Sequence, residues 1–252
     1  MIELDVMCHY LDDLLDVSAY ADYAPNGLQV EGASEVKSIA VGVTASLALI
    51  EAAVAMKADA ILVHHGYFWK NENPCVTGIK KRRLELLLKN NISLLSYHLP
   101  LDAHPRYGNN VVLGKRLDID IEGALAPRLG DGLVLHGRLA APLSPAEFVS
   151  LLEKHLARRP LHLPGGPSRI QHVAWCSGAA QGYFEQVAAM GVDAYLTGEV
   201  SEQSTHIALE TGTHFFSAGH HATERYGVQA LAEHLQARFS IDCHFLDIAN
   251  PV

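Results

Sequence analysis

Three clusters of histidine and acidic side chains carry the chemistry that this sequence could perform. Each cluster follows a run of apolar residues, and the three are His64 with His65, His98 with Asp102, and His220 with Glu224. Neutral imidazole mixed with carboxylate is typical of sites for zinc, iron(II), manganese or cobalt, and less typical of calcium or magnesium sites. An isolated histidine is more often a hydrogen-bonded strand or helix end, but three clusters together favour a metal site.

The number of candidate ligands favours two ions. Without His98, the clusters supply three imidazoles and two carboxylates, more than one structural zinc ion needs. If one carboxylate bridges, the set suits two ions roughly 3.5–4 Å apart. His98 is then a candidate for proton transfer, and the alternative is a hydrogen-bonded loop histidine.

The spacing inside the clusters indicates how the side chains could converge. Adjacent strand residues point to opposite faces, so His64 and His65 share a site only where the strand gives way to a turn, which Gly66 favours. His220 and Glu224 are four residues apart, which places both on one face of a helical turn. Ligand groups in parallel α/β sheets collect at the carboxyl ends of strands, so we expect the metal site there.

The elements that must position these clusters alternate along the chain. Apolar runs between turn residues predict strands, and amphipathic or alanine-rich segments predict helices. This alternation favours an α/β fold with largely parallel mixed sheets, in which residues 23–30 and 99–105 form loops. The expected strands are 36–43, 59–65, 92–98, 213–218 and 243–248, and the expected helices are 2–17, 47–57, 78–90, 108–117, 145–157, 201–211 and 222–238.

An internal repeat divides the chain into two similar parts. With an offset of 134 residues, 36–62 aligns without a gap on 170–196, and the strand, helix and strand of one segment fall on those of the other. We therefore expect two α/β halves, 1–125 and 126–252, that form one compact unit with the metal site between them. Glycine and proline, including Pro127 and Gly130, interrupt residues 118–145, which we interpret as a boundary or crossover.

Composition limits the class of protein. The net charge of −9 argues against extended nucleic-acid binding, since that binding depends on lysine and arginine. No apolar run is long enough to cross a bilayer, and the first residues do not resemble a signal peptide, so we expect a cytoplasmic protein. The four cysteines are far apart in the sequence, which favours buried free thiols over a disulfide framework.

The motifs together resemble those of the GTP cyclohydrolase I type 2 family, the YbgI-like dinuclear metal-binding proteins. The matching segments are Asn26-Gly27-Leu28-Gln29-Val30, Val63-His64-His65-Gly66, His98-x-x-Leu101-Asp102 and Gly219-His220-x-x-x-Glu224. The resemblance implies two ions held by His64, His65, Asp102, His220 and Glu224, with Glu224 bridging. It also implies a ring-shaped homohexamer whose metal sites face an internal cavity. Leu99-Pro100 departs from the Thr-Asn that is common in this family.

Three functions are compatible with this pattern. The first is a dinuclear-metal-dependent hydrolase in which a metal-bridging hydroxide attacks the ring of a purine nucleotide, with Fe, Zn or Mn as the ions and His98 transferring a proton. The second is a dinuclear phosphoesterase that acts on nucleotides. The third is a metal-binding regulatory or scaffold protein without turnover.

Overall fold

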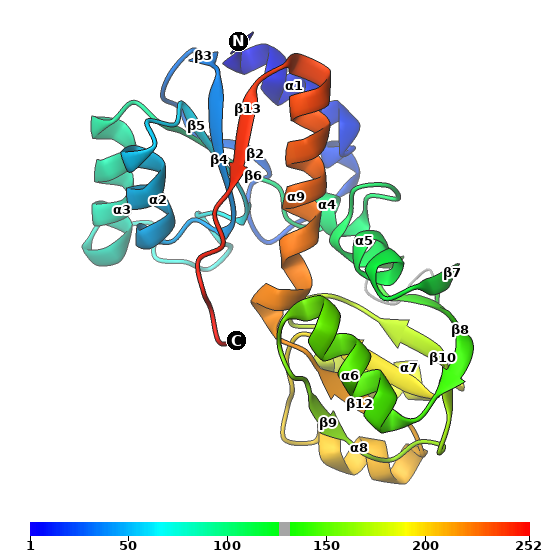
Figure 1. Cartoon of the computed structure of the whole chain (residues 1–252). Coiled ribbons are helices and arrows are strands. Elements are labelled where there is room, and N and C mark those ends of the chain that lie inside the picture. The colour runs from blue at the N-terminus through cyan, green and yellow to red at the C-terminus, as the bar shows by residue number, and fades with distance from the viewer. Residues whose placement is uncertain (126–131) are drawn as a thin grey trace. The chain divides into compact units, whose positions relative to one another are not determined.

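The computed structural model describes residues 1–125 and 132–252, which form two compact units (Figure 1). The first unit combines Met1–Tyr107 with Gly227–Ala249, and the second combines Gly108–Tyr226 with Asn250–Val252. The predicted halves, 1–125 and 126–252, meet beside residues 126–131. Residues 126–131, which include the predicted breaks at Pro127 and Gly130, lie outside the described residues. The division into these two halves therefore stays a prediction.

The first unit is built on a five-stranded sheet with the order β13-β4-β5-β6-β2. The first four strands are parallel, and β2 pairs antiparallel with β6. A separate two-stranded sheet joins β1 and β3. The strands are β1 (Ile2–Glu3), β2 (Gly27–Val30), β3 (Glu35–Val36), β4 (Ser38–Thr44), β5 (Ala60–His65), β6 (Ser93–Ser96) and β13 (Asp242–Phe245).

Helices bury both faces of this sheet. One apolar cluster joins Leu11 of α1 and Leu231 of α9 to Leu62 of β5. Another joins Leu49 of α2 and Leu87 of α3 to the opposite side of β5. Burial on both faces explains the continuous apolar run before His64. The helices of this unit are α1 (Leu4–Leu14), η1 (Val17–Ala19), α2 (Leu47–Ala55), α3 (Gly78–Lys89), α4 (Leu99–Ala103) and most of α9 (His220–Phe239).

The second unit has a six-stranded sheet with the order β7-β8-β10-β11-β12-β9. Its three strands β10, β11 and β12 are parallel, whereas β7, β8 and β9 pair antiparallel. The strands are β7 (Ile119–Ala124), β8 (Leu135–Leu143), β9 (Leu161–Leu163), β10 (Ile170–Trp175), β11 (Ala194–Thr197) and β12 (His214–Ser217). The α/β fold with mixed sheets is confirmed, with more antiparallel pairing here than the sequence predicted.

Helices again cover both faces. Leu113 of α5 and Phe148 of α6 pack on Trp175, and Phe184 of α7 packs on Phe215 of β12 from the other side. Ser144 caps α6 by accepting from the backbone N–H of Glu147, and the Glu147 side chain accepts from the backbone N–H of Ser144, which together form a capping box. The helices are α5 (Asn109–Arg116), α6 (Pro145–Leu156), η3 (Gln181–Tyr183), α7 (Phe184–Ala188) and α8 (Ser204–Thr211).

The 134-residue repeat is visible as the same hydrogen bonds in both units. Oδ2 of Asp59 accepts from the backbone N–H groups of Lys37 and Ser38, at 2.8 and 3.0 Å. Oδ2 of Asp193 accepts from those of residues 171 and 172, at 2.9 and 2.8 Å. Each aspartate thus joins the start of one parallel strand to the start of the next at the same offset, which supports the sequence alignment.

Three predicted irregular segments contain regular structure. The expected loop 23–30 includes strand β2, which pairs antiparallel with β6. The expected loop 99–105 includes the short helix α4, because Pro100 occupies its first turn, where no backbone N–H is needed. The expected boundary at 118–145 instead contributes the paired strands β7 and β8. Glycine and proline hid these strands because they lie at bulges and strand ends, where the pleated pattern is interrupted.

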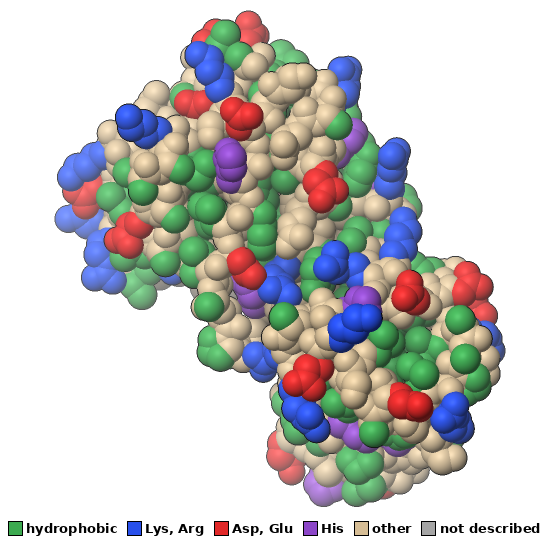
Figure 2. All heavy atoms as spheres, viewed as in Figure 1, with side chains coloured by type: hydrophobic (Ala, Val, Ile, Leu, Met, Phe, Trp, Pro, Cys, Tyr) green, Lys and Arg blue, Asp and Glu red, His purple; other side chains and the backbone are tan. Residues whose placement is uncertain are grey.

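The distribution of charged side chains and the burial of the cysteines can be compared with what the sequence predicted. Figure 2 shows basic and acidic side chains interspersed over much of the visible face. Lys80, from the basic run of α3, pairs with Glu72 at 2.9 Å. Cys8 and Cys176 are buried free thiols as predicted, whereas Cys75 is exposed. Among the described residues, no helix is both long and apolar enough to span a bilayer.

Candidate metal centre

The carboxyl end of β5 gathers imidazoles in the first unit. His64 is fully buried, and its ring centroid lies 4.6 Å from that of His65. His64, His65 and His98 can each offer a ligand atom, and these atoms lie within 4.8 Å of one another. Both histidines still belong to β5, so they come together at the end of the strand without the preceding turn that the sequence suggested.

Hydrogen bonds orient the two β5 imidazoles. Nδ1 of His64 lies 2.9 Å from the backbone oxygen of Tyr97, and Nδ1 of His65 lies 3.2 Å from Oγ1 of Thr44. A histidine ligand commonly donates one ring N–H to a carbonyl, which fixes the tautomer and directs the other nitrogen to the ion. Nε2 of His64 accordingly faces Oδ2 of Asp102 at 3.5 Å.

The chain after His65 turns where only glycine fits. A Cβ on Gly66 would lie 2.2 Å from Oε1 of Gln29. That oxygen accepts from the backbone N–H of Tyr67 at 2.7 Å, and Nε2 of Gln29 donates to the backbone oxygen of Tyr67 at 3.1 Å. The Asn26–Val30 motif therefore holds the turn that follows the histidines.

His98 is held by Asp22, a residue that the sequence analysis missed. Nδ1 of His98 lies 2.7 Å from Oδ1 of Asp22, and the backbone N–H of His98 donates to Oδ1 of Asn26 at 2.7 Å. Burial alone would raise the pKa of Asp22, but hydrogen bonds from His98 and Asn26 lower that pKa to about 2. Asp22 lies 76 residues from its partner, so local spacing held no signal for this pair.

Asp102 completes what we call the first-unit ligand set, which comprises His64, His65, His98 and Asp102. It lies in α4, is 7% exposed, and is carried on a helical turn whose backbone begins at His98. The backbone N–H of Asp102 donates to the oxygen of His98 at 3.1 Å. The set thus offers three imidazoles and one carboxylate.

The first turn of α9 and the end of β11 supply the second-unit ligand set, His220, Glu224 and Glu199. Nε2 of His220 lies 3.0 Å from Oε2 of Glu224, and its Nδ1 lies 2.7 Å from Oε1 of Glu199. Burial alone would lower the pKa of His220, but Glu224 and Glu199 raise it to about 9. The predicted pairing of His220 with Glu224 on one helical turn is therefore observed.

Close backbone packing makes room for these side chains. Gly178 adopts a φ of +68°, and a Cβ there would lie 2.1 Å from Oε1 of Glu224. The N–H of Gly178 donates to Oγ1 of Thr223 at 3.0 Å. Any larger residue at position 178 would push against the carboxylate that the sequence singled out.

Aromatic rings flank the first-unit ligand set. The ring of Trp69 lies 5.1 Å from that of His98 and 6.0 Å from that of His65, and its Nε1 donates to the oxygen of Gly66. Tyr23 is 60% exposed and its ring lies 6.4 Å from that of His98. Tyr67, in contrast, is buried and donates to the oxygen of Ala45 at 2.6 Å.

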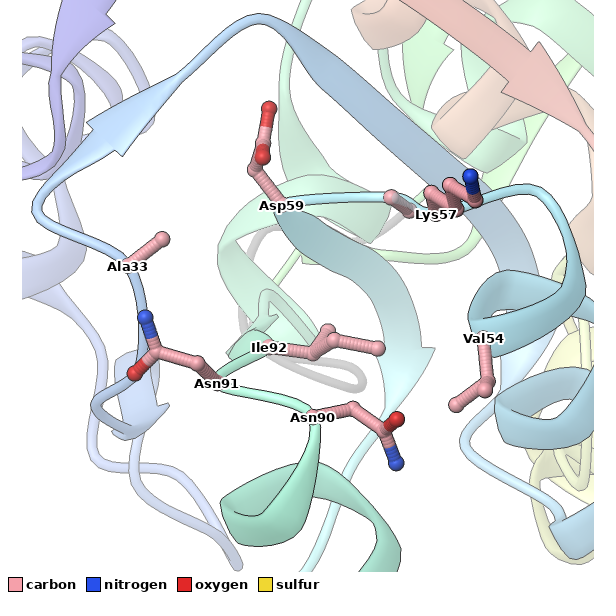
Figure 3. A pocket seen from close by; sticks show the side chains of 8 residues that line it. Ala33, Val54, Lys57, Asp59, Asn90, Asn91 and Ile92 are labelled. Carbon is pink, nitrogen blue, oxygen red and sulfur yellow. The ribbon is translucent and has the colours of Figure 1, made fainter.

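A separate pocket of about 230 Å³ lies at the amino ends of the first-unit strands (Figure 3). Its lining includes Lys57, Asp59, Asn90 and Asn91, and the described residues of this lining include no histidine. Asp59 directly precedes β5, whereas His64 and His65 end that strand. The pocket is therefore at the opposite end of β5 from the imidazoles.

Comparison with known proteins gives the family. Residues 2–251 match the family model described as Duf34/NIF3 (NGG1p interacting factor 3). The chain belongs to the Duf34/NIF3 family. A relative from Allochromatium vinosum, named GTP cyclohydrolase 1 type 2 homolog, is 55% identical over 252 residues, covering 100% of this chain and 98% of that protein. One of the same name from Pseudomonas aeruginosa is 55% identical, covering 99% of each chain.

Solved structures of similar proteins share the fold of this Duf34/NIF3 chain. The structure described as protein ybgI, of unknown function, is 47% identical with a TM-score of 0.96 over 100% of both chains. The protein TTHA1606 from Thermus thermophilus is 34% identical with a TM-score of 0.91, again over 100% of both. These findings confirm the resemblance drawn from the motifs.

Proposed function

We propose that this protein is a metal-dependent hydrolase of the GTP cyclohydrolase 1 type 2 kind, with two divalent ions per chain. The residues that would hold the ions are His64, His65 and Asp102 with His220 and Glu224, and Glu224 would be shared by both ions. The observation that carries the proposal is the gathering of three imidazoles and a buried carboxylate at the ends of β5 and β6. We further propose that the two ligand sets act on one centre, in which His98 and Glu199 lie beside the ions and do not bind them.

The donor atoms fit such ions. Imidazole nitrogens and carboxylate oxygens are the ligands that Fe, Zn and Mn take, and each set contains both types. His64 is oriented by its hydrogen bond to the backbone oxygen of Tyr97, and His220 by its hydrogen bond to Glu199. Histidines that bind metal are commonly oriented in this way, through the ring nitrogen that does not face the ion. The absence of a side chain at Gly178 leaves space for the Glu224 carboxylate.

Bound divalent ions would supply Lewis acidity toward water and toward an electron-rich ring. Side chains of the protein would transfer the proton and bind the base. Asp22 holds Nδ1 of His98, so Nε2 is the atom that can carry a proton. Trp69 and Tyr23 offer aromatic faces beside His98 on which a planar base can stack.

The proposed substrate is a purine nucleotide resembling GTP. Water adds to C8 and gives up a proton to Nε2 of His98. The bond between C8 and one ring nitrogen breaks, that nitrogen receives the proton from Nε2, and C8 stays on the other nitrogen as a formyl group. A second water hydrolyses this formyl group and releases formate. The support consists of the aromatic faces of Trp69 and Tyr23, the pairing of His98 with Asp22, and the names of the relatives from Allochromatium vinosum and Pseudomonas aeruginosa.

The test measures metal and turnover on the same samples. Protein purified without chelator is analysed for Fe, Zn and Mn per chain and then incubated with GTP, with ring-opened product and formate followed by mass spectrometry. His64→Ala and His220→Ala are expected to lose metal and product together. His206→Ala is the matched control, because His206 is exposed beside Glu202. Metal-loaded protein that gives no ring-opened product would overturn this substrate.

The same assay separates the two other functions. Release of phosphate from a nucleotide panel, abolished by Asp102→Ala, would establish a phosphoesterase instead. Full metal occupancy without turnover of any nucleotide, and without a water-accessible coordination position, would establish a scaffold.

The homohexameric ring and the cytoplasmic location remain predictions. Native mass spectrometry of the metal-loaded protein tests the ring, since a hexamer of this 27.4 kDa chain is readily distinguished from a dimer or trimer.

A further inference from the structure

A second group of metal-type side chains lies in the second unit, on strands that the sequence analysis did not connect with chemistry. Glu122 of β7, His136 of β8 and His172 of β10 can each offer a ligand atom, and these atoms lie within 4.8 Å of one another. The three strands are neighbours in the sheet. None of the three residues belongs to either ligand set described above.

The distances among these side chains suit one ion. Nδ1 of His136 lies 3.1 Å from Nε2 of His172 and 3.3 Å from Oε2 of Glu122. Metal–ligand bonds of about 2.0–2.1 Å at a tetrahedral angle separate ligand atoms by roughly 3.3 Å. Two imidazoles and one carboxylate are also the protein ligands of many zinc and iron(II) sites that keep a position open for water.

The sheet is locally irregular where the carboxylate enters. The register of β7 against β8 shifts between Ile121 and Gly123, which makes Glu122 the extra residue of a bulge. Bulges turn a side chain away from the regular alternation and are common beside functional sites. Gly123 has a φ of +135°, a conformation that favours glycine. The bulge therefore directs Glu122 toward His136.

Neighbouring groups hold the three side chains in place. Nε of Arg138 donates to Oε1 of Glu122 at 3.1 Å, while Oε2 faces His136. The backbone N–H of His172 donates to Oδ2 of Asp193 at 2.8 Å, which fixes the start of β10. The Glu122 side chain is 38% exposed and that of His136 is 20% exposed, so an ion and water can reach them from solvent.

We propose that Glu122, His136 and His172 form a separate binding site for one divalent transition-metal ion. The site is distinct from the proposed dinuclear centre and does not depend on it. Ligands carried on three paired strands are more rigid than ligands on loops, which favours binding of an ion without reorganisation of the backbone.

The test counts zinc ions bound by the full-length chain in equilibrium dialysis, over a range of free Zn²⁺. Wild type is expected to bind one more ion per chain than His172→Ala and His136→Ala. Glu122→Gln keeps the shape of the side chain. It is expected to lower the affinity of the site for this ion at least about tenfold, which is the lower end of the loss of metal affinity on removing a residue that orients a metal ligand. His206→Ala, in the same unit, is expected to match wild type.

The outcomes are distinguishable from those of the proposed function. His64→Ala and His220→Ala should retain the ion at Glu122, His136 and His172 even where the dinuclear centre is lost. Crystals soaked in Zn²⁺ should show an anomalous peak among the three side chains. Equal zinc counts and affinities for wild type and Glu122→Gln, or no anomalous peak at saturating Zn²⁺, would overturn the site.

Discussion

At the scale of single residues, the position of His98 decides between a proton carrier and a metal ligand. Its Nδ1 is held by Asp22, and it lies with His64 and His65 in one group. We expect His98→Gln to keep both ions of the dinuclear centre while turnover of GTP falls by about 100-fold or more, the usual effect of removing a general acid or base. Metal content and kcat measured on one sample check this. Loss of an ion from His98→Gln would make His98 a ligand.

Asp22 provides a test by pH. Its pKa is about 2 in the folded protein, below the ordinary value of 3.8. A carboxyl with a lowered folded pKa stabilises the protein above its unfolded pKa, and this stabilisation is lost as pH falls through the folded pKa. The free energy of unfolding of Asp22→Asn should therefore fall below that of wild type at pH 6, with the difference shrinking from about pH 4 toward pH 2. Urea unfolding at pH 6, 4 and 3 measures it, and a constant difference would contradict the role of the ionised carboxylate.

At the scale of elements, the repeated aspartates should have similar effects in the two units. Asp59 and Asp193 each accept two backbone N–H groups at the start of a parallel strand. We expect Asp59→Ala and Asp193→Ala each to lower the free energy of unfolding by about 1–3 kcal/mol, because each leaves two donors without their acceptor. Chemical denaturation checks the values. A negligible change in the free energy of unfolding at either position would contradict the expectation that the two equivalent aspartates stabilise their units to a similar extent.

The loop after β10 contains Gly178, and substitution of this glycine gives a second prediction at this scale. We expect Gly178→Ala to lower the free energy of unfolding by roughly 1–3 kcal/mol, since it combines a left-handed φ with contact against Glu224. Metal affinity should fall with it. Gly182→Ala is the matched control, because a Cβ at Gly182 meets nothing within 4 Å.

The elements also show how far sequence patterns reach. The run 60–63 before His64 was sufficient to predict β5, and the helix expected from residue 145 agrees with the start of α6, because both signals are local. The strands β7 and β8 were missed, since their register contains a bulge and their pairing is visible only across the sheet. The same limit hid Asp22 and the group around His136. Their partners come from distant segments, and no spacing along the chain records that proximity.

At the scale of the whole molecule, metal should stabilise the fold. An ion present at about 100 times its dissociation constant adds about 2.7 kcal/mol to the free energy of unfolding. For a chain of this size we expect removal of the ions by a chelator to lower the Tm by roughly 5–10 °C. Differential scanning calorimetry before and after chelation, with metal added back, measures the shift. An unchanged Tm would mean that the ligand sets hold no ion in the purified protein.

The discontinuity of the first unit has a consequence for how the chain is made. Its sheet takes strand β13, residues 242–245, from a segment that is synthesised only after residues 108–226, the main part of the second unit. Until then, β4 lacks the parallel neighbour that pairs with it in the finished sheet. An unpaired strand edge can join another chain. The order of synthesis thus exposes β4 of the nascent chain to wrong pairing until translation is almost complete.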